Sequence, residues 1–230
     1  MTIWCKKVNS SNTTYFAGRQ IDYEYEEFNP YGSSQTEGQN IVIVEPFSIE
    51  DDEGMYLFKG CSNATIDHLD WIDTSNCTRF DEMFSNCWNL RSVDLSSWDS
   101  HNVTRTANMF FGSDALREIN LIGWDVSAVE MCGSMFGLCQ ALTTIKVDEG
   151  TDWQVQMTNC YDDADMFEAC YKLPGFREYG TGLEMANTNK YFTGVWTWTK
   201  TDILEKVNDN WEIINVYIKD NTWKSVEVYK

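Results

Sequence analysis

A regular internal repeat is the feature of this sequence that most constrains its fold. The pairs Met83-Phe84, Met109-Phe110 and Met135-Phe136 are evenly spaced, with twenty-six positions from one to the next. Leu57-Phe58 precedes the first pair by the same interval, and Met166-Phe167 follows the last after a longer step of thirty-one. A single unit of this length cannot bury its apolar side chains alone, so successive units must stack on one another. The sequence therefore predicts a solenoid of stacked coils.

Each unit also contains a short stretch with the alternation of a β-strand. Leu-x-x-Val-x-Leu patterns recur at residues 90–95, 116–121 and 142–147, with Ile and Val as variants. Alternate residues of a strand point to opposite faces, so we expect these strands to bury their apolar residues and to stack in parallel. Residues 104–110 and their equivalents are expected to form a helical turn on the far side. The predicted fold class is therefore α/β, with parallel strands and helical turns.

The second half of each unit has its own signature, which leads to a known repeat family. Residues 72–78 and 98–104 both begin with an apolar residue and Asp and end on Thr, and residues 124–127 begin in the same way. Together with the preceding Met-Phe-x-x-Cys, these units resemble the BspA-like leucine-rich repeats over residues 55–180. The resemblance implies a short leucine-rich-repeat solenoid of about four to five coils. Ser113 in the Cys position and an insertion around Gly150 depart from the family pattern.

The positions that recur in every unit form the predicted interior. A free cysteine behaves as a small hydrophobe. The eight cysteines include no Cys-x-x-Cys pair, so reduced, buried thiols are favoured, with disulfides or a metal site as the alternatives. The expected core ladder consists of Phe58, Phe84, Phe110, Phe136, Phe167, Cys61, Cys87, Cys139, Cys170, Trp98 and Trp124.

The segments on either side of the repeats are expected to be separate units. Residues 1–54 are predicted to form a β-rich N-terminal cap or anchoring segment, with a buried strand at residues 41–44. The solenoid is assigned to residues 55–186, and a C-terminal β-hairpin module to residues 187–230. In this module residues 211–217 match residues 223–229 at a spacing of 12, with a turn between them. Over that short stretch the pattern resembles C-terminal modules of structural proteins of tailed bacteriophages.

The charge balance restricts the partners of the chain. Seventeen basic and 36 acidic residues give a formal net charge of −19. This charge argues against nucleic acid and against anionic lipid as ligands. No apolar run reaches the ~18–20 residues of a membrane span, and the first residues lack the apolar stretch of a secretory signal. We therefore expect neither a membrane segment nor a leader.

The sequence contains no recognisable catalytic motif. His68 and His101 are the only histidines, and both lie outside the recurrent positions. A phosphate-binding loop, a nucleophile elbow and a zinc-protease motif are all missing. The acidic clusters at 51–53 and 162–165 are interpreted as solvated loops, with a calcium site or a glycosidase carboxylate pair as alternatives. We predict no enzymatic activity, no cofactor and no metal site.

The strand face of the solenoid is the predicted binding surface, because curved repeats use that face for recognition. Polar side chains alternate there with the core residues, and such a mixed strip suits a protein or glycan ligand. The predicted ligand-binding residues are Ser92, Asp94, Ser96, Glu118, Asn120, Ile122, Thr144 and Lys146.

These features together predict a non-enzymatic structural or binding protein. The favoured interpretation is a virion component of a tailed bacteriophage, either a head fibre, a capsid decoration or a tail-associated adhesin. Particles released by lysis need no secretory signal. The expected partners are other virion proteins or further copies of the chain, bound through the N- and C-terminal β segments, and a host-surface protein or glycan. The alternative is a bacterial or protist cell-surface adhesin of the BspA-like family, since its relatives are often implicated in adhesion.

Overall fold

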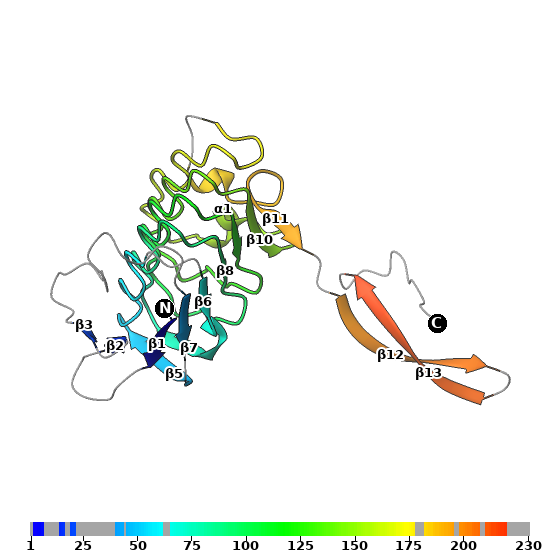
Figure 1. Ribbon diagram of the computed structural model, residues 1–230. Coiled ribbons are helices and arrows are strands. Elements are labelled where there is room, and N and C mark those ends of the chain that lie inside the picture. The colour runs from blue at the N-terminus through cyan, green and yellow to red at the C-terminus, as the bar shows by residue number, and fades with distance from the viewer. Residues whose placement is uncertain are drawn as a thin grey trace.

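The structure is a computed structural model that describes residues 2–6, 14–16, 19–21, 40–43, 45–61, 65–177, 182–195, 198–207 and 210–219. It contains a parallel-β solenoid of about four turns with little helix (Figure 1). The predicted solenoid is thus confirmed, whereas the helical part of the predicted α/β class is not. In the described residues helix is confined to α1 (Trp153–Gln156), η1 (Leu69–Trp71) and η2 (Leu183–Met185).

One side of the coils is a parallel sheet. Its strands lie in the order β11 (Thr193–Val195), β10 (Thr144–Asp148), β9 (Glu118–Asn120) and β8 (Ser92–Asp94). Val93, Ile119 and Ile145 are partners in register across this sheet, and all three are buried. A slip of one residue would turn these side chains out to solvent, so the apolar pattern specifies the register.

The parallel pairing continues upstream of the repeat that the sequence revealed. Two further parallel pairs are β4 (Asn40–Ile43) with β6 (Thr65–Asp67), and β5 (Phe47–Asp51) with β7 (Ile72–Cys77). The strand predicted at residues 41–44 is confirmed over residues 41–43, where Ile41 and Ile43 are fully buried, and residue 44 lies outside the described residues. Pairing therefore crosses the predicted boundary between residues 54 and 55, and the boundary itself stays a prediction.

The N-terminal strands extend the sheet from β4. β1 (Thr2–Lys6) pairs with β4 in parallel, β2 (Thr14–Phe16) pairs with β1 antiparallel, and β3 (Arg19–Ile21) pairs with β2 antiparallel. The resulting sheet has the order β3-β2-β1-β4-β6. Most of the described residues of the predicted N-terminal cap, residues 1–54, thus lie in strands.

The far side of the coils is built from turns, and the predicted helical turn over residues 104–110 and its equivalents is wrong. Phe84 N donates to Met109 O of the next coil at 2.8 Å, whereas Met83 N donates to Phe80 O within its own coil at 3.2 Å. This alternation is repeated in the neighbouring coils. An α-helix keeps its backbone hydrogen bonds inside one segment. Here every second N–H reaches the adjacent coil, so the turn side also joins the coils.

Two positions in each turn segment have a positive φ. In one coil these are Glu82 and Asn86, and in the next they are Asn108 and Gly112. Recurrent left-handed residues are incompatible with an α-helix, but β-turns of type II require them. At Gly112 the φ is +70°, and an added Cβ would lie 2.6 Å from Asn86 Oδ1. Glycine at this position therefore avoids both backbone strain and a clash with the neighbouring coil.

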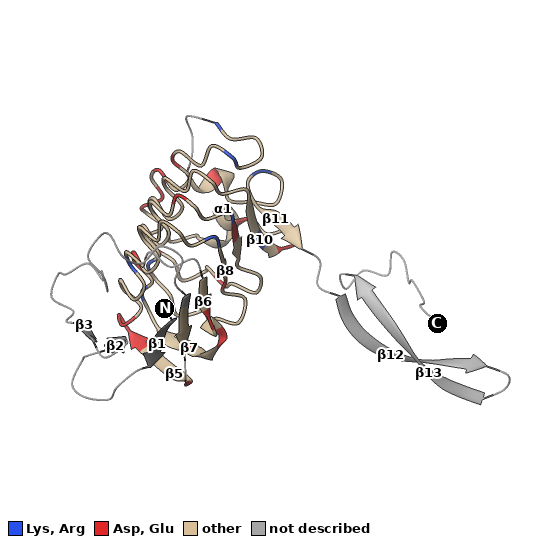
Figure 2. Ribbon diagram, viewed as in Figure 1, with Lys and Arg blue, Asp and Glu red and all other residues tan. Residues whose placement is uncertain are grey.

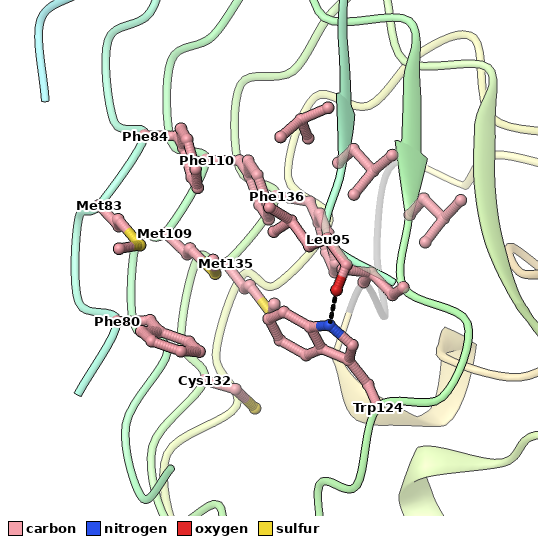
Figure 3. Packing of buried hydrophobic residues seen from close by; sticks show 14 of the residues in the cluster. Phe80, Met83, Phe84, Leu95, Met109, Phe110, Trp124, Cys132, Met135 and Phe136 are labelled. Carbon is pink, nitrogen blue, oxygen red and sulfur yellow. Dashed lines mark hydrogen bonds between the residues drawn. The ribbon is translucent and has the colours of Figure 1, made fainter. Parts of the chain in front are cut away.

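A stack of phenylalanine rings runs through the interior (Figure 3). The ring centroids of Phe84 and Phe110 are 5.5 Å apart, and those of Phe110 and Phe136 are 5.7 Å apart, with the rings nearly parallel. Stacked aromatic pairs contribute about 0.5–1.5 kcal/mol each beyond the burial of their area. The structure places every residue of the expected core ladder in the interior: Phe58, Phe84, Phe110, Phe136, Phe167, Cys61, Cys87, Cys139, Cys170, Trp98 and Trp124.

The tryptophans of the ladder also bond to the preceding coil. Trp98 Nε1 donates to Leu69 O at 2.9 Å. Trp124 Nε1 donates to Leu95 O, also at 2.9 Å (Figure 3). A buried indole N–H needs such a partner. The recurrent Trp thus fills the interior and satisfies a backbone carbonyl at the same time.

The cysteine position supplies a hydrogen-bond donor. Cys139 Sγ donates to Phe110 O at 3.1 Å, and Ser113 Oγ donates to Phe84 O at 2.7 Å. Ser113 therefore does what the thiol does in other coils, which explains why it can replace cysteine. Burial raises the pKa of Cys87 to about 12, so this thiol is protonated at neutral pH and is a poor nucleophile.

The last coil is closed by the segment of residues 182–195. Tyr191 and Phe192 meet the ring of Phe167 edge-on, with centroids 5.1 and 6.3 Å away. Phe192 also meets Trp153 edge-on at 4.7 Å. Terminal coils of a solenoid have to be covered, and the change from stacked to edge-on rings ends the phenylalanine ladder here.

The described part of the C-terminal module is a hairpin that includes one of the predicted strands, residues 211–217. β12 (Trp198–Val207) pairs antiparallel with β13 (Asn210–Lys219) along the full length of both strands. Residues 211–217 thus pair with β12. Residues 223–229 lie outside the described residues, so their predicted pairing with residues 211–217 stays a prediction. Among the described strands, β12 and β13 pair only with each other.

Candidate binding surface

The predicted binding strip lies on the outer face of β8, β9 and β10, between the buried residues of those strands. Two rows cross these strands in register: Ser92, Glu118 and Thr144 form one row, and Asp94, Asn120 and Lys146 form the other. Ser96 and Ile122 follow the ends of β8 and β9. The strands thus bring together residues that are far apart in the sequence.

The strip becomes more sheltered from β8 towards β10. Ser92, Asp94 and Ser96 are exposed, whereas the residues of the strip on the two later coils are half-buried. Their neighbours Val93 and Ile119 are buried beneath the sheet. A ligand on this face would therefore meet polar side chains standing on a rigid, apolar layer.

Polar contacts fix several of these side chains. Lys146 Nζ lies 2.6 Å from Glu118 Oε1, an ion pair that joins β10 to β9. Asp94 Oδ1 accepts hydrogen bonds from Ser96 N at 3.0 Å and from Ser96 Oγ at 2.7 Å. These contacts restrain the side chains before any ligand binds, which lowers the entropy cost of binding.

Asp94 stays ionised on this surface at neutral pH. Partial burial opposes its ionisation, but hydrogen bonds from Ser96 and Asn120 and the charge of Lys146 outweigh it, so the pKa of Asp94 is lowered. The strip therefore presents carboxylates, an ammonium group, an amide and hydroxyls side by side. Such a set can donate and accept hydrogen bonds, as protein and glycan ligands require.

A ladder of aspartates on another corner of the coils was not identified from the sequence. Asp73, Asp99 and Asp125 follow the recurrent Ile or Trp position and are all exposed. The backbone N–H of the residue two positions later donates to each carboxylate, at 3.0, 3.1 and 2.9 Å. The Trp-Asp repeat could have revealed this ladder, because Asp commonly caps a turn in this way.

These hydrogen bonds lower the pKa of all three aspartates. For Asp73 and Asp125 the main cause is the backbone N–H of Ser75 and Ser127, and for Asp99 it is the side chain of His101, which bonds to its carboxylate. The carboxylates thus act as turn caps. Acidic positions recur over the solenoid and outnumber basic ones (Figure 2).

Comparison with known protein families identifies the family to which the repeats belong. Residues 53–175, more than half of the chain, match the family described as "Mycoplasma protein of unknown function, DUF285". The chain belongs to this family. BspA-like proteins carry DUF285 domains. Searches of curated proteins and of solved structures found no match to the chain.

The DUF285 match coincides with the stacked rings of the interior. It starts just before the first turn segment and contains the whole ladder from Phe58 to Phe167. Strands β4 and β5 and the closing segment of residues 182–195 lie outside it, although they pack on or pair with the coils. The DUF285 region is therefore the repetitive part of a larger folded unit.

The two acidic clusters outside the strip have local partners. Glu53 Oε2 accepts from Glu50 N at 3.0 Å, and Asp163 Oδ2 accepts from Leu183 N at 3.1 Å. No set of three or more His, Cys, Asp or Glu arranged to hold a metal ion occurs in the described parts of this DUF285 protein. The calcium alternative therefore gains no structural support among those residues, and the glycosidase alternative stays untested.

Aromatic side chains are split between interior and surface. Trp98 and Trp124 are buried and use their indole N–H inside the DUF285 core, so they are not available for stacking on a sugar ring. Trp88 and Tyr171, each directly after a recurrent cysteine, are 54% and 60% exposed. Within the described residues, no helix is long and apolar enough to span a membrane.

Proposed function

We propose that this protein is a non-enzymatic recognition module of the BspA-like leucine-rich-repeat type, displayed on a surface, which binds a protein or glycan through the strip on β8, β9 and β10. The observation that carries this proposal is the register of the strip. Asp94, Asn120 and Lys146 are partners across neighbouring strands, and an ion pair and hydrogen bonds restrain their side chains. Preorganised polar groups on a rigid sheet suit binding.

The surrounding structure supports binding better than catalysis. The buried cysteine position is occupied by protonated donors such as Cys87, and both histidines lie outside the strip. His101 bonds to Asp99, on the corner with the aspartate ladder. Each coil adds one row to the same face, which is how repeat proteins build recognition surfaces.

The proposal also concerns the surface on which the protein is displayed, either a cell or a virion. The family description names Mycoplasma proteins, which favours a cell surface over the virion of a tailed bacteriophage. Sedimentation and immunogold labelling with an antibody to the chain separate these two locations. Label on cell envelopes supports the adhesin, whereas label that sediments with phage particles supports the virion component.

The binding role is tested with the fluorescently labelled protein on whole cells. We expect saturable binding that the double variant Asp94→Ala/Lys146→Ala reduces at least tenfold. Gln154→Ala, at an exposed residue of α1, is the matched control and should bind like the wild type. Pretreating the cells with protease or with glycosidases then tells a protein ligand from a glycan. Equal binding by the double variant and the wild type would overturn the role of the strip.

A further inference from the structure

One pair of cysteines behaves differently from the others. The Sγ atoms of Cys132 and Cys160 are 3.5 Å apart, although the residues lie on either side of the insertion. The backbone holds the two segments in register, because Cys132 N donates to Asp162 O at 2.8 Å and Tyr161 N donates to Glu130 O at 3.0 Å. The contact between the two sulfur atoms is therefore a consequence of coil stacking.

Neither cysteine occupies the recurrent cysteine position. Cys132 stands where earlier coils have Phe80 and Thr106, one repeat apart, so the coil does not require a thiol there. Figure 3 shows Cys132 in the interior near Phe80. Cys160 follows Val129 by the same longer step that separates Phe136 from Phe167. The ladder cysteine Cys139 instead donates to a carbonyl oxygen.

We propose that Cys132 and Cys160 form an intramolecular disulfide when the chain meets an oxidising environment. A disulfide has an S–S length of about 2.05 Å, so the sulfur atoms must approach by roughly 1.5 Å from their present contact. The bond would tie the coil of Met135 and Phe136 to the chain beyond the insertion, across the segment that interrupts the regular period of the repeat. This inference does not depend on the proposed function.

The oxidant is a small disulfide such as oxidised glutathione. Cys160 is half-buried whereas Cys132 is fully buried, so the thiolate of Cys160 attacks first and releases one glutathione thiol. Cys132 then loses its proton and displaces the second glutathione from Cys160. Two cysteine thiols are oxidised to one disulfide, and one glutathione disulfide is reduced to two thiols. Burial, followed by the neighbouring Cys160, raises the pKa of Cys132, so the second step should accelerate with rising pH.

The test uses the complete folded chain and oxidised glutathione at pH 8. The remaining thiols are then alkylated under denaturing conditions, and the digest is analysed by mass spectrometry. We expect a Cys132–Cys160 linked peptide as the main disulfide product. We also expect an increase in Tm of roughly 5–10 °C, reversed by reductant, since the bond closes a loop of almost thirty residues. A stable glutathione adduct on Cys160, or alkylation of both cysteines, would overturn the proposal.

Variants separate this pair from the ladder thiols. Cys160→Ser should abolish the oxidative increase in Tm. Cys170→Ser is the matched control, because its hydroxyl can keep the hydrogen bond to Phe136 O that the thiol makes at 3.0 Å, and it should retain the full increase. The linked-peptide measurement on the wild type does not depend on either variant folding. An increase in Tm that survives in Cys160→Ser contradicts the proposed disulfide.

Discussion

The two sides of each coil carry equally regular sequence patterns but different backbone structures. On the strand side, Val93, Ile119 and Ile145 alternate with polar residues and form a parallel sheet. On the turn side, Met83 and Phe84 are both fully buried although they are adjacent, and the backbone around them turns repeatedly. Strict alternation identifies a strand by itself, whereas a buried apolar pair is compatible with a helix or with turns.

The hydrogen bonds explain the difference between the two sides. A helical turn would satisfy its N–H groups locally, but Phe84 N and Phe110 N each donate to the next coil at 2.8 Å. The turn side therefore contributes to cohesion between coils as the strands do. The stacking of the coils therefore determines the conformation of the turn side. The sequence of a single unit does not show which carbonyl oxygens its N–H groups will bond to.

The largest expected effect comes from removing a ring of the turn-side ladder. Phe110→Ala should lower the free energy of unfolding by about 3–5 kcal/mol, because it leaves a cavity between Phe84 and Phe136. Ile119→Val on the strand side should cost only about 0.5–1.5 kcal/mol. Urea denaturation followed by fluorescence measures both. Equal losses for the two variants would contradict the central place of the ladder.

A smaller effect tests the donor role of the cysteine position. Ser113 Oγ donates to Phe84 O and accepts from Cys87 N at 3.0 Å, both in the interior. Ser113→Ala should destabilise the protein by about 1–3 kcal/mol, since it leaves buried polar groups without partners. Ser113→Cys, which the repeat pattern favours, should stay close to wild type in the same denaturation assay. A harmless Ser113→Ala would show that this position needs only a small side chain.

The sign of the stability change caused by a glycine substitution distinguishes turns from a helix on this side of the coils. Ser134 has a φ of 53°. In a turn with positive φ, Ser134→Gly should raise the stability by up to about 1 kcal/mol. In a helix the same change would lower it by a similar amount. Ser127→Gly, at a residue whose φ is not positive, is the control. A lower Tm for Ser134→Gly alone would support the helical interpretation.

The smallest expected effect concerns the aspartate ladder and pH. Hydrogen bonding lowers the pKa of Asp125, so its contribution to stability is present above the ordinary value of about 4 and is lost as the pH falls through the lowered one. Tm measured between pH 2 and 6 should therefore fall in acid for the wild type. Asp125→Asn keeps an oxygen acceptor but cannot titrate, so its Tm should fall less steeply. If Tm depended on pH in the same way for the wild type and for Asp125→Asn, Asp125 would not contribute to the loss of stability in acid.

The fold was predictable from the sequence to the extent that the repeat is regular. The strand positions and the buried character of Phe110, Cys139 and Trp124 follow from a fixed period, because stacked units place equivalent residues on top of one another. The pairing of residues 211–217 with β12 was not predicted, since the sequence of residues 198–207 does not share the repeated pattern that drew attention to residues 211–217. The sequence named the polar residues that alternate along these strands, but not their ion pair and hydrogen bonds, and their binding role stays a prediction.

The sequence by itself determined that this chain stacks coils of a fixed length, which apolar residues face inward and which polar residues alternate with them along the strands. Periodicity is enough for these conclusions because burial follows it. The tertiary structure decided where the backbone N–H groups of the turn side bond, how Tyr191 and Phe192 close the last coil, and that Cys132 meets Cys160. Each of these depends on contacts between coils, and a linear pattern does not specify the distance between two side chains brought together by stacking.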